Sequence, residues 1–150
     1  MQDKGKAMRE IHGGCHCGNI TYEIELPNAL ETYNPRECDC KLCTTHGASY
    51  VSDKNGTLNI KIKNNEYVSK YRQGSRIADF IVCKKCGVMT GVCYEEGGVI
   101  YGSVNIRATR EYGEFGKGQV AHLTELSDKE RIARWKDLWF SNIKIESEIA

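Results

Sequence analysis

Apolar and polar residues alternate along two stretches of the chain, residues 20–26 and 58–62. A period of two places successive side chains on opposite faces of a half-buried strand, so each stretch is predicted to be a strand. Three further stretches are predicted strands, namely residues 77–82, 88–94 and 99–104. Glycine-containing turns are predicted at 53–56 and at 95–98, and the second would close a hairpin. The pattern therefore predicts a mainly β protein.

One helix is predicted near the C-terminal end of the sequence. Ser127 precedes Asp128-Lys129-Glu130, which matches a capping box with serine at the N-cap and glutamate three residues later. Four apolar residues then fall on one helical face, namely Ile132, Trp135, Leu138 and Trp139. We expect this face to pack on the sheet, with the tryptophans in core packing rather than ligand binding. The glycine-rich stretch 111–118 is predicted to be a loop and is a candidate lid.

The length of 150 residues suits one domain, and 40% hydrophobic with 27% charged residues is an ordinary globular balance. A chain of this size can bury a core without metal ions, so any metal is expected to have a more local task. Residues 1–10 are predicted to be a flexible N-terminal segment. Residues 11–140 are predicted to form a single domain, and residues 141–150 a C-terminal tail.

The formal charge of +1 comes without any long basic run, which argues against nucleic acid as the main partner. The first ten residues contain no apolar h-region, which argues against a secretory signal. No stretch approaches 18 apolar residues, so no segment is predicted to span a membrane. These features predict a cytosolic (cytoplasmic) protein, and clustered cysteines in that compartment more often bind metal than form disulfides.

Seven of the eight cysteines fall in three clusters with the spacings C-x-C, C-x-C-x-x-C and C-x-x-C. In order, the clusters are Cys15 and Cys17; Cys38, Cys40 and Cys43; and Cys83 and Cys86. Thiolates two or three positions apart can curl around one ion about 2.3 Å from each sulfur. Neighbouring glycines allow the tight turns that aim backbone amides at sulfur. We therefore predict zinc, with an iron–sulfur cluster or seven buried or disulfide-linked cysteines as the alternatives.

Seven ligands divide naturally as four plus three, and the spacing allows two divisions. Either the first and third clusters share one ion and the second cluster is a local triad, or Cys40 and Cys43 join the third cluster as a zinc ribbon. In the second case the first cluster remains with Cys38. A four-thiolate zinc is closed and structural, whereas three protein ligands leave a position for water or substrate. A thiol substrate suits that position because zinc binds thiolates well.

The sequence gives less evidence of a functional role for the other residues near the clusters. Cys93 has no close cysteine partner and is predicted to be a small core residue. His16 and His46 are candidates for a hydrogen bond to a ligand, for proton transfer or for a fourth ligand, against the alternative of exposed loop histidines. Asp39 is a candidate hydrogen-bonding residue, against a solvated carboxylate. Nearby lysines would offset thiolate charge or meet an anionic substrate; they are Lys41, Lys84 and Lys85.

In this order the clusters resemble those of the glutathione-dependent formaldehyde-activating enzyme family, also called the CENP-V/GFA domain family. The resemblance is carried by GGCHCGNITYE at 13–23, CDCKLC at 38–43 and CKKCG at 83–87, and GSVN at 102–105 looks like a family strand. It spans residues 11–107, so it makes the predicted 11–140 domain a CENP-V/GFA-like zinc domain.

The resemblance implies an Mss4-like β-tent of antiparallel sheets with zinc-pinned loops, to which the pattern adds a short C-terminal helix. It also implies two zinc ions per chain. A structural zinc would be held by Cys15, Cys17, Cys83 and Cys86. A catalytic zinc would be held by Cys38, Cys40 and Cys43, which are then the catalytic residues.

The implied activity is that of a carbon–sulfur lyase that acts on glutathione or a related thiol and on formaldehyde or another small aldehyde. With formaldehyde the adduct is S-(hydroxymethyl)glutathione, and the expected partner is a small-molecule thiol. The alternative is a non-catalytic zinc-binding interaction module, because Mss4-like folds also serve in interactions. Residues 44–50 keep a loose likeness to the family, and the chain leaves its pattern from Ala108 onward, where part of the substrate contacts are expected.

Overall fold

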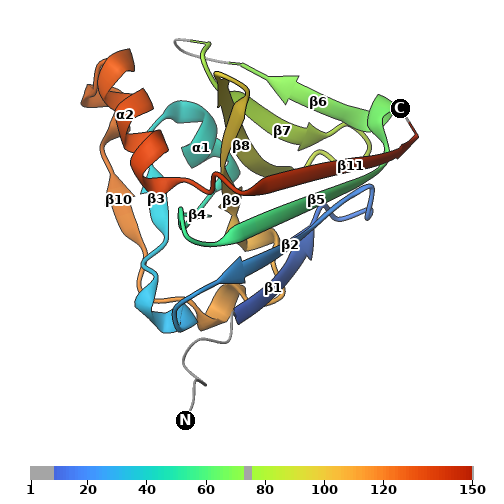
Figure 1. Cartoon of the computed structure of the whole chain (residues 1–150), viewed down its shortest axis with the longest axis horizontal. Coiled ribbons are helices and arrows are strands. Elements are labelled where there is room, and N and C mark those ends of the chain that lie inside the picture. The colour runs from blue at the N-terminus through green and yellow to red at the C-terminus, as the bar shows by residue number, and fades with distance from the viewer. Residues whose placement is uncertain (1–8, 73–75, 150) are drawn as a thin grey trace.

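Two β-sheets pack on a shared core to form the protein (Figure 1). The structure is a computed structural model, and it describes residues 9–72 and 76–149. The four-stranded sheet has the order β1–β2–β5–β11, with the bounds β1 Arg9–Gly14, β2 Ile20–Leu26, β5 Thr57–Asn64 and β11 Ile143–Ile149. The seven-stranded sheet has the order β10–β3–β4–β9–β8–β7–β6, with the bounds β10 Gln119–Ala121, β3 Arg36–Cys38, β4 Tyr50–Val51, β9 Val99–Asn105, β8 Met89–Glu96, β7 Asp79–Cys83 and β6 Val68–Tyr71.

Strand β2 shows how the sequence pattern becomes structure. Its side chains alternate between buried and more exposed positions, with Tyr22 and Ile24 among the buried ones. The antiparallel register with β5 sets Tyr22 opposite Ile60 and Ile24 opposite Leu58. The apolar side chains of both strands therefore share one face, where cross-strand pairs stabilise the sheet. The predicted strands at 20–26 and 58–62 are confirmed.

The next three predicted strands correspond to β7, β8 and β9, with ends shifted by a few residues. They form an antiparallel meander in the seven-stranded sheet. The predicted hairpin loop between β8 and β9 contains Gly97 and Gly98, with φ angles of 62° and 81°. Such positive φ angles favour glycine and match the twist of a tight hairpin.

Each sheet also contains one parallel pair at an edge, which differs from the expectation of wholly antiparallel sheets. Strand β11 runs parallel to β5, and β10 runs parallel to β3. The segment 141–150, expected to be a tail, therefore includes an edge strand. Ile143 and Ile145 alternate with polar residues, which is a strand signal, but Ile145 is 44% exposed and the strand buries little apolar surface. Of the segment 1–10, residues 1–8 lie outside the described residues, and Arg9 and Glu10 belong to β1.

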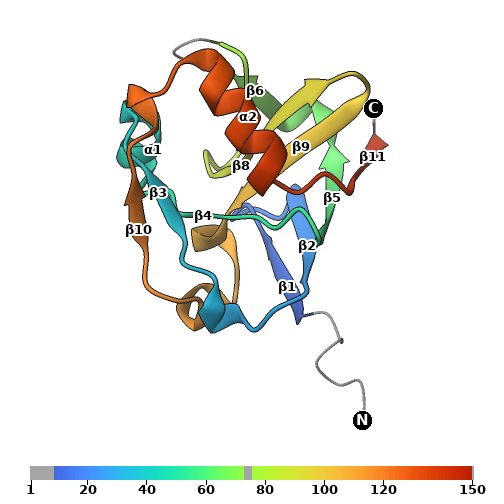
Figure 2. The same cartoon turned by 60° about the vertical axis from the view of Figure 1, so that its left-hand side comes forward.

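The helix α2 (Asp128–Leu138) begins at the predicted capping box. The Glu130 amide donates to Ser127 Oγ at 3.1 Å, and the Ser127 amide donates to the Glu130 carboxylate at 2.8 Å. The rings of Trp135 and Trp139 stack with centroids 4.8 Å apart and are buried in a second core cluster beside β8. Figure 2 shows α2 next to β8 and β9. Both tryptophans are therefore packing residues, as predicted, and they have a further role described below.

Short helices connect the strands: α1 (Lys41–His46) and the 3₁₀ helices η2 (Leu30–Thr32), η3 (Asn65–Tyr67), η4 (Ile106–Ala108), η5 (Tyr112–Glu114) and η6 (Leu123–Glu125). The predicted loop 111–118 contains η5 and packs on the segment before β3. The Gly116 amide donates to the Tyr33 carbonyl at 2.9 Å. A Cβ at Gly116 would lie 2.6 Å from the Glu31 carbonyl oxygen, so this close approach requires glycine.

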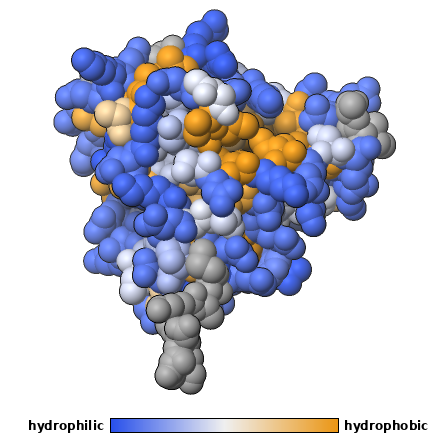
Figure 3. Space-filling model, in the orientation of Figure 1, coloured by the Kyte–Doolittle hydropathy of each residue, from blue (hydrophilic) through white to orange (hydrophobic). Residues whose placement is uncertain are grey.

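The surface is mostly hydrophilic on the face shown in Figure 3, with a hydrophobic area between α2 and β6. Large hydrophobic residues that stay exposed include Val99 of β9 and Ile145 of β11. Within the described part of the chain, none of the helices has the length and apolar character needed to cross a membrane.

Candidate functional site

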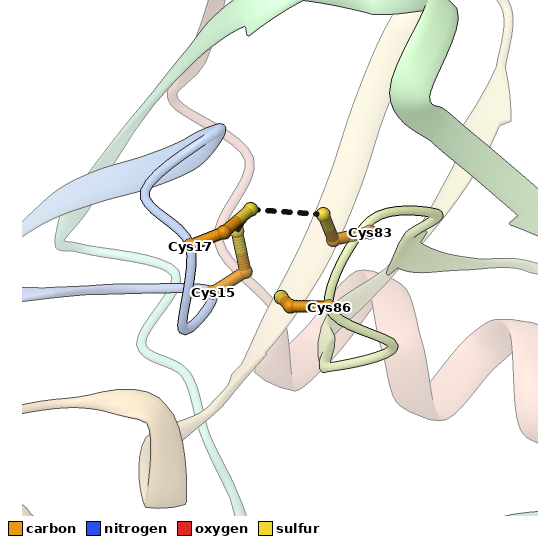
Figure 4. A group of neighbouring side chains, drawn as sticks. All are labelled: Cys15, Cys17, Cys83 and Cys86. Carbon is orange, nitrogen blue, oxygen red and sulfur yellow. Dashed lines mark hydrogen bonds between the residues drawn. The ribbon is translucent and has the colours of Figure 1, made fainter.

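Four cysteine sulfurs from two distant segments converge at one point (Figure 4). Cys15 and Cys17 lie on the loop between β1 and β2, whereas Cys83 ends β7 and Cys86 lies on the turn before β8. All four Sγ atoms lie within 4.8 Å of one another. Cys17 Sγ is 3.7 Å from Cys15 Sγ and 3.5 Å from Cys83 Sγ. These residues are called the four-cysteine group below.

Glycines shape both loops of the four-cysteine group. Gly18 and Gly87 directly follow the second cysteine of each loop and have φ angles of 86° and 80°, a region that other residues rarely adopt. The Gly87 amide donates to the Cys83 carbonyl at 2.8 Å and closes its turn. The Ile20 amide donates to Cys15 Sγ at 3.3 Å. An amide aimed at sulfur in this way stabilises the charge of a thiolate.

The spacing of these sulfurs fits a tetrahedral metal site. Metal–sulfur bonds of about 2.3 Å at tetrahedral angles place the sulfurs about 3.8 Å apart. The two measured separations, 3.5 and 3.7 Å, are close to that value. Burial raises the pKa of Cys15 to about 12, so a nearby cation is needed to hold this ligand as a thiolate at neutral pH. Because the group joins one loop of each sheet, a bound ion would cross-link the two sheets.

Three other cysteines form a local group within six residues, called the three-cysteine group below. Cys38 ends β3, Cys40 is the N-cap of α1, and Cys43 lies in the first turn of that helix. Their Sγ atoms lie within 4.8 Å of one another. The Cys40 amide donates to Cys38 Sγ at 3.5 Å, and the Cys43 amide donates to Cys40 Sγ at 3.4 Å. The structure thus groups the cysteines as the resemblance implies and not as a ribbon that joins Cys40 and Cys43 to the third cluster.

The thiols of the three-cysteine group compete for negative charge. Hydrogen bonds from the thiols of Cys38 and Cys43 lower the pKa of Cys40 well below its ordinary value. The hydrogen bond with Cys40 in turn raises the pKa of Cys38, and the bonds with Cys38 and Cys40, followed by burial, raise the pKa of Cys43. Three thiolates at neutral pH therefore require a cation among them, so this donor set fits a metal ion held by three protein ligands.

A buried tyrosine contacts the three-cysteine group. Tyr50 Oη lies 3.2 Å from Cys43 Sγ and 3.9 Å from Met89 Sδ. Burial, and then the negative charge of Cys43, raise the pKa of Tyr50, so its hydroxyl keeps its proton and can donate it to sulfur. Tyr50 was not predictable as a site residue from the sequence, because its spacing from the cysteines carries no recognisable signal.

A cavity of about 180 Å³ opens onto the three-cysteine group. A water molecule takes about 30 Å³ in the liquid, so the cavity has room for roughly six. Its apolar wall is formed by Tyr50, Ile77, Ala78, Phe80, Val92, Leu123, Trp135 and Trp139. Its polar wall is formed by Arg36, Ser103, Thr124, Arg131 and Arg134. Trp135 of α2 and its C-cap residue Trp139 therefore also face the site, and residues 111–118 do not line this cavity.

Asp39 connects the three-cysteine group to the cavity wall. Its carboxylate accepts hydrogen bonds from the amides of Leu123 and Thr124 at 3.1 and 3.2 Å and from the Thr124 hydroxyl at 3.0 Å. Although desolvation raises it, the hydrogen bonds from Thr124 and His122 hold the pKa of Asp39 below its ordinary value. Because Leu123 and Thr124 line the cavity, Asp39 is a hydrogen-bonding residue that fixes this wall beside two of the cysteines.

Several other residues singled out in the sequence lie outside the two cysteine groups. His16 and His46 are exposed, and neither belongs to a cysteine group. Cys93 is half-buried against the core, and burial raises the pKa of its thiol to about 12. The lysines beside the ligands are exposed, and Lys85 Nζ lies 5.2 Å from the centre of the Tyr67 ring. In the described ranges 9–72 and 76–149, the two cysteine groups are the clusters suited to a metal ion.

Comparison with known proteins gives one family match and a similar solved structure. Residues 10–109 match the family described as glutathione-dependent formaldehyde-activating enzyme, which covers more than half of the 150-residue chain and includes both cysteine groups. The crystal structure of a Rhodobacter sphaeroides protein is similar at 24% sequence identity and a TM-score of 0.49. The similarity covers 72% of this chain and 99% of that chain. A likeness of this degree carries no functional meaning.

Proposed function

The chain belongs to the glutathione-dependent formaldehyde-activating enzyme family, and from this membership we propose that it is a zinc-dependent carbon–sulfur lyase. It would join a thiol such as glutathione to a small aldehyde, or release the two from their adduct. The proposal is supported by the unequal division of the cysteines, with three of them at the wall of a cavity. Four thiolates saturate a zinc ion, whereas three leave one position for a substrate.

Zinc is proposed for both groups because ligand sets made only of cysteine favour soft metal ions over magnesium or calcium. A zinc ion held by the three-cysteine group would supply Lewis acidity that lowers the pKa of a thiol substrate. Cys38, Cys40 and Cys43 hold that ion and are the proposed catalytic residues. The four-cysteine group is proposed to be structural, because its sulfurs come from both sheets and satisfy all four positions.

The chemical step is the addition of a thiolate sulfur to a carbonyl carbon. The carbon–sulfur bond forms, the π-electron pair of the carbonyl moves to oxygen, and the proton lost by the thiol ends on that oxygen. The cavity would hold the carbonyl compound beside the sulfur, which replaces a chance encounter by a fixed approach. Its apolar wall keeps bulk water away from the reacting atoms.

Tyr50 is proposed to tune the site through its contact with a ligand sulfur. Its buried hydroxyl lies 3.2 Å from Cys43 Sγ, and its raised pKa keeps it in the donor form. A hydrogen bond to this sulfur withdraws negative charge from one ligand, which leaves the metal ion more positive toward a bound thiol. The proposed partner is a small-molecule thiol in the cytosol, where cysteines stay reduced.

The proposal is tested by following adduct formation from glutathione and formaldehyde, and from glutathione and larger aldehydes, against the uncatalysed rate. Cys40→Ser is expected to abolish the acceleration and to keep the fold. Cys93→Ser removes a cysteine outside both groups and is expected to keep full activity. If the zinc-loaded protein accelerates none of several thiol–aldehyde pairs, a non-catalytic zinc-binding interaction module describes it better.

A further inference from the structure

Two guanidinium groups line the cavity without a carboxylate to balance them. Arg36 of β3 and Arg134 of α2 both line it, and among the described residues no carboxylate forms an ion pair with either. The polar partner of Arg36 is neutral, because its Nη2 donates to Ser52 Oγ at 2.6 Å. Partly buried cations of this kind are costly unless an anion accompanies them.

The remainder of the cavity suits an apolar group. Trp135 and Trp139 are stacked on one wall, and Phe80 and Val92 come from the sheet. In the described part of the chain, no aspartate or glutamate lines the cavity. A group with an ammonium charge, such as the amino end of glutathione, would therefore find no partner there. The interior matches an apolar anion better than a zwitterionic peptide.

The volume of the cavity also exceeds the needs of the smallest aldehyde. Formaldehyde has two heavy atoms, about the size of two water molecules, and the cavity of about 180 Å³ has room for roughly six waters. Binding sites usually enclose most of the surface of their ligand. A cavity of this size beside the reacting sulfur therefore points to a larger carbonyl compound.

We propose that this cavity binds the carbonyl partner of the thiol, and that this partner is an aldehyde with an apolar body that ends in a carboxylate held by Arg36 and Arg134. The inference rests on the proposed function and names its substrate class. The thiol sulfur bonds to the aldehyde carbon, the thiol proton ends on the aldehyde oxygen, and the carboxylate is unchanged. Glutathione would reach the three-cysteine group with its sulfur from the open side of the cavity.

Binding is tested first, with probes that cannot react. Hexanoate, its neutral analogue hexanamide and the short anion acetate are titrated into the zinc-loaded protein by calorimetry. Hexanoate is expected to bind at least about ten-fold more tightly than either, since a hydrogen bond to a charged group and an apolar chain each contribute on that scale. Arg134→Gln is expected to remove most of the advantage over hexanamide. Lys129→Gln removes the same charge from an exposed position of α2 outside the cavity and is expected to leave it unchanged.

Turnover is tested next, with glutathione and the matched pair 6-oxohexanoate and hexanal. The carboxylated aldehyde is expected to have a kcat/KM at least about ten-fold higher, through a lower KM, and Arg134→Gln is expected to equalise the pair. Equal rates for the pair, together with weaker glutathione binding in Arg134→Gln, would show that the arginines hold the thiol instead and would overturn the proposal. Loss of metal from Arg134→Gln with unchanged hexanoate affinity would also overturn it, because the arginines would then only balance the thiolates.

The binding test and the turnover test together separate this inference from the proposed function. If hexanoate binds in an Arg134-dependent way and no aldehyde reacts, the carboxylate site stands and the lyase activity fails. If aldehydes react without any preference for the carboxylate, the activity stands and the substrate class fails. Arg36→Lys keeps a charge but loses the planar fork, and it is expected to weaken hexanoate more than hexanamide while the urea midpoint of unfolding stays near the wild-type value.

Discussion

The exposed ligand Cys17 gives the clearest test of the four-cysteine group as a cross-link between the sheets. Its side chain is exposed, so Cys17→Ser removes a thiolate with little change in packing. Substitutions at exposed positions usually change the free energy of unfolding by about 0.5 kcal/mol or less. A larger loss would therefore come from the metal link itself.

The size of that loss follows from the chain length that the link encloses. Cys17 and Cys83 are 66 residues apart in the sequence, and their sulfurs are 3.5 Å apart. Closing a loop of that length removes about 15 cal/mol/K from the unfolded chain, which is ~4 kcal/mol at 25 °C. Domains are stable by about 5–15 kcal/mol, so the loss is a large part of the total. With a urea dependence of ~2 kcal/mol/M, the unfolding midpoint is expected to fall by about 2 M.

The assay is urea unfolding followed by tryptophan fluorescence, with metal content measured on the same samples. His16→Ser is the matched control, because His16 is the exposed neighbour of Cys17 and belongs to neither cysteine group. It is expected to keep both the wild-type midpoint and the wild-type metal content. The reasoning is refuted if Cys17→Ser loses its metal and still unfolds at the same urea concentration as the control.

Three further predictions concern the second site and the helix beside it. Tyr50→Phe removes the hydroxyl near Cys43 Sγ and keeps the ring, so kcat is expected to fall about ten-fold with little change in KM. An unchanged kcat in steady-state kinetics would contradict the tuning role. Asp39→Asn weakens the hydrogen bonds from the amides of Leu123 and Thr124, so the KM for the aldehyde is expected to rise. The metal content measured by mass spectrometry is expected to stay constant, and a loss of metal would contradict this role of Asp39. Ser127→Ala removes the N-cap of α2 and is expected to lower the free energy of unfolding by about 1 kcal/mol in urea titrations, whereas no change would show that the cap is dispensable.

The strands that bury one face were predictable from the sequence, because burial imposes alternation. Residues 20–26 and 58–62 show this, since their apolar side chains meet on one face of the sheet. Strand β11 has the same alternation but stays partly exposed at a parallel edge, and no local pattern specifies which strand an edge will join. Strand β10 is three residues long, with Val120 exposed, so it carries too little signal for a prediction.

The candidate site was predictable only in part for a related reason. Spacing identified seven cysteines but left their division open, because the partners of Cys83 and Cys86 lie more than 60 residues away along the chain. The family resemblance made the choice that spacing could not make. The cavity escaped prediction altogether, since Arg36, Tyr50 and Arg134 meet only once β3, β4 and α2 have packed together. Asp39 was noticed in the sequence, but its partners Leu123 and Thr124 were not foreseeable from it.

The central claim is that the three-cysteine group binds a metal ion and leaves it open to a thiol. Cobalt(II) can replace zinc in such sites, and its visible absorption reports the number of sulfur ligands. In protein loaded with cobalt at both groups, titration with glutathione is predicted to add sulfur-to-cobalt absorption that saturates at one thiol per chain and is missing in Cys40→Ser. A spectrum that stays the same on addition of glutathione and of other small thiols would contradict the account.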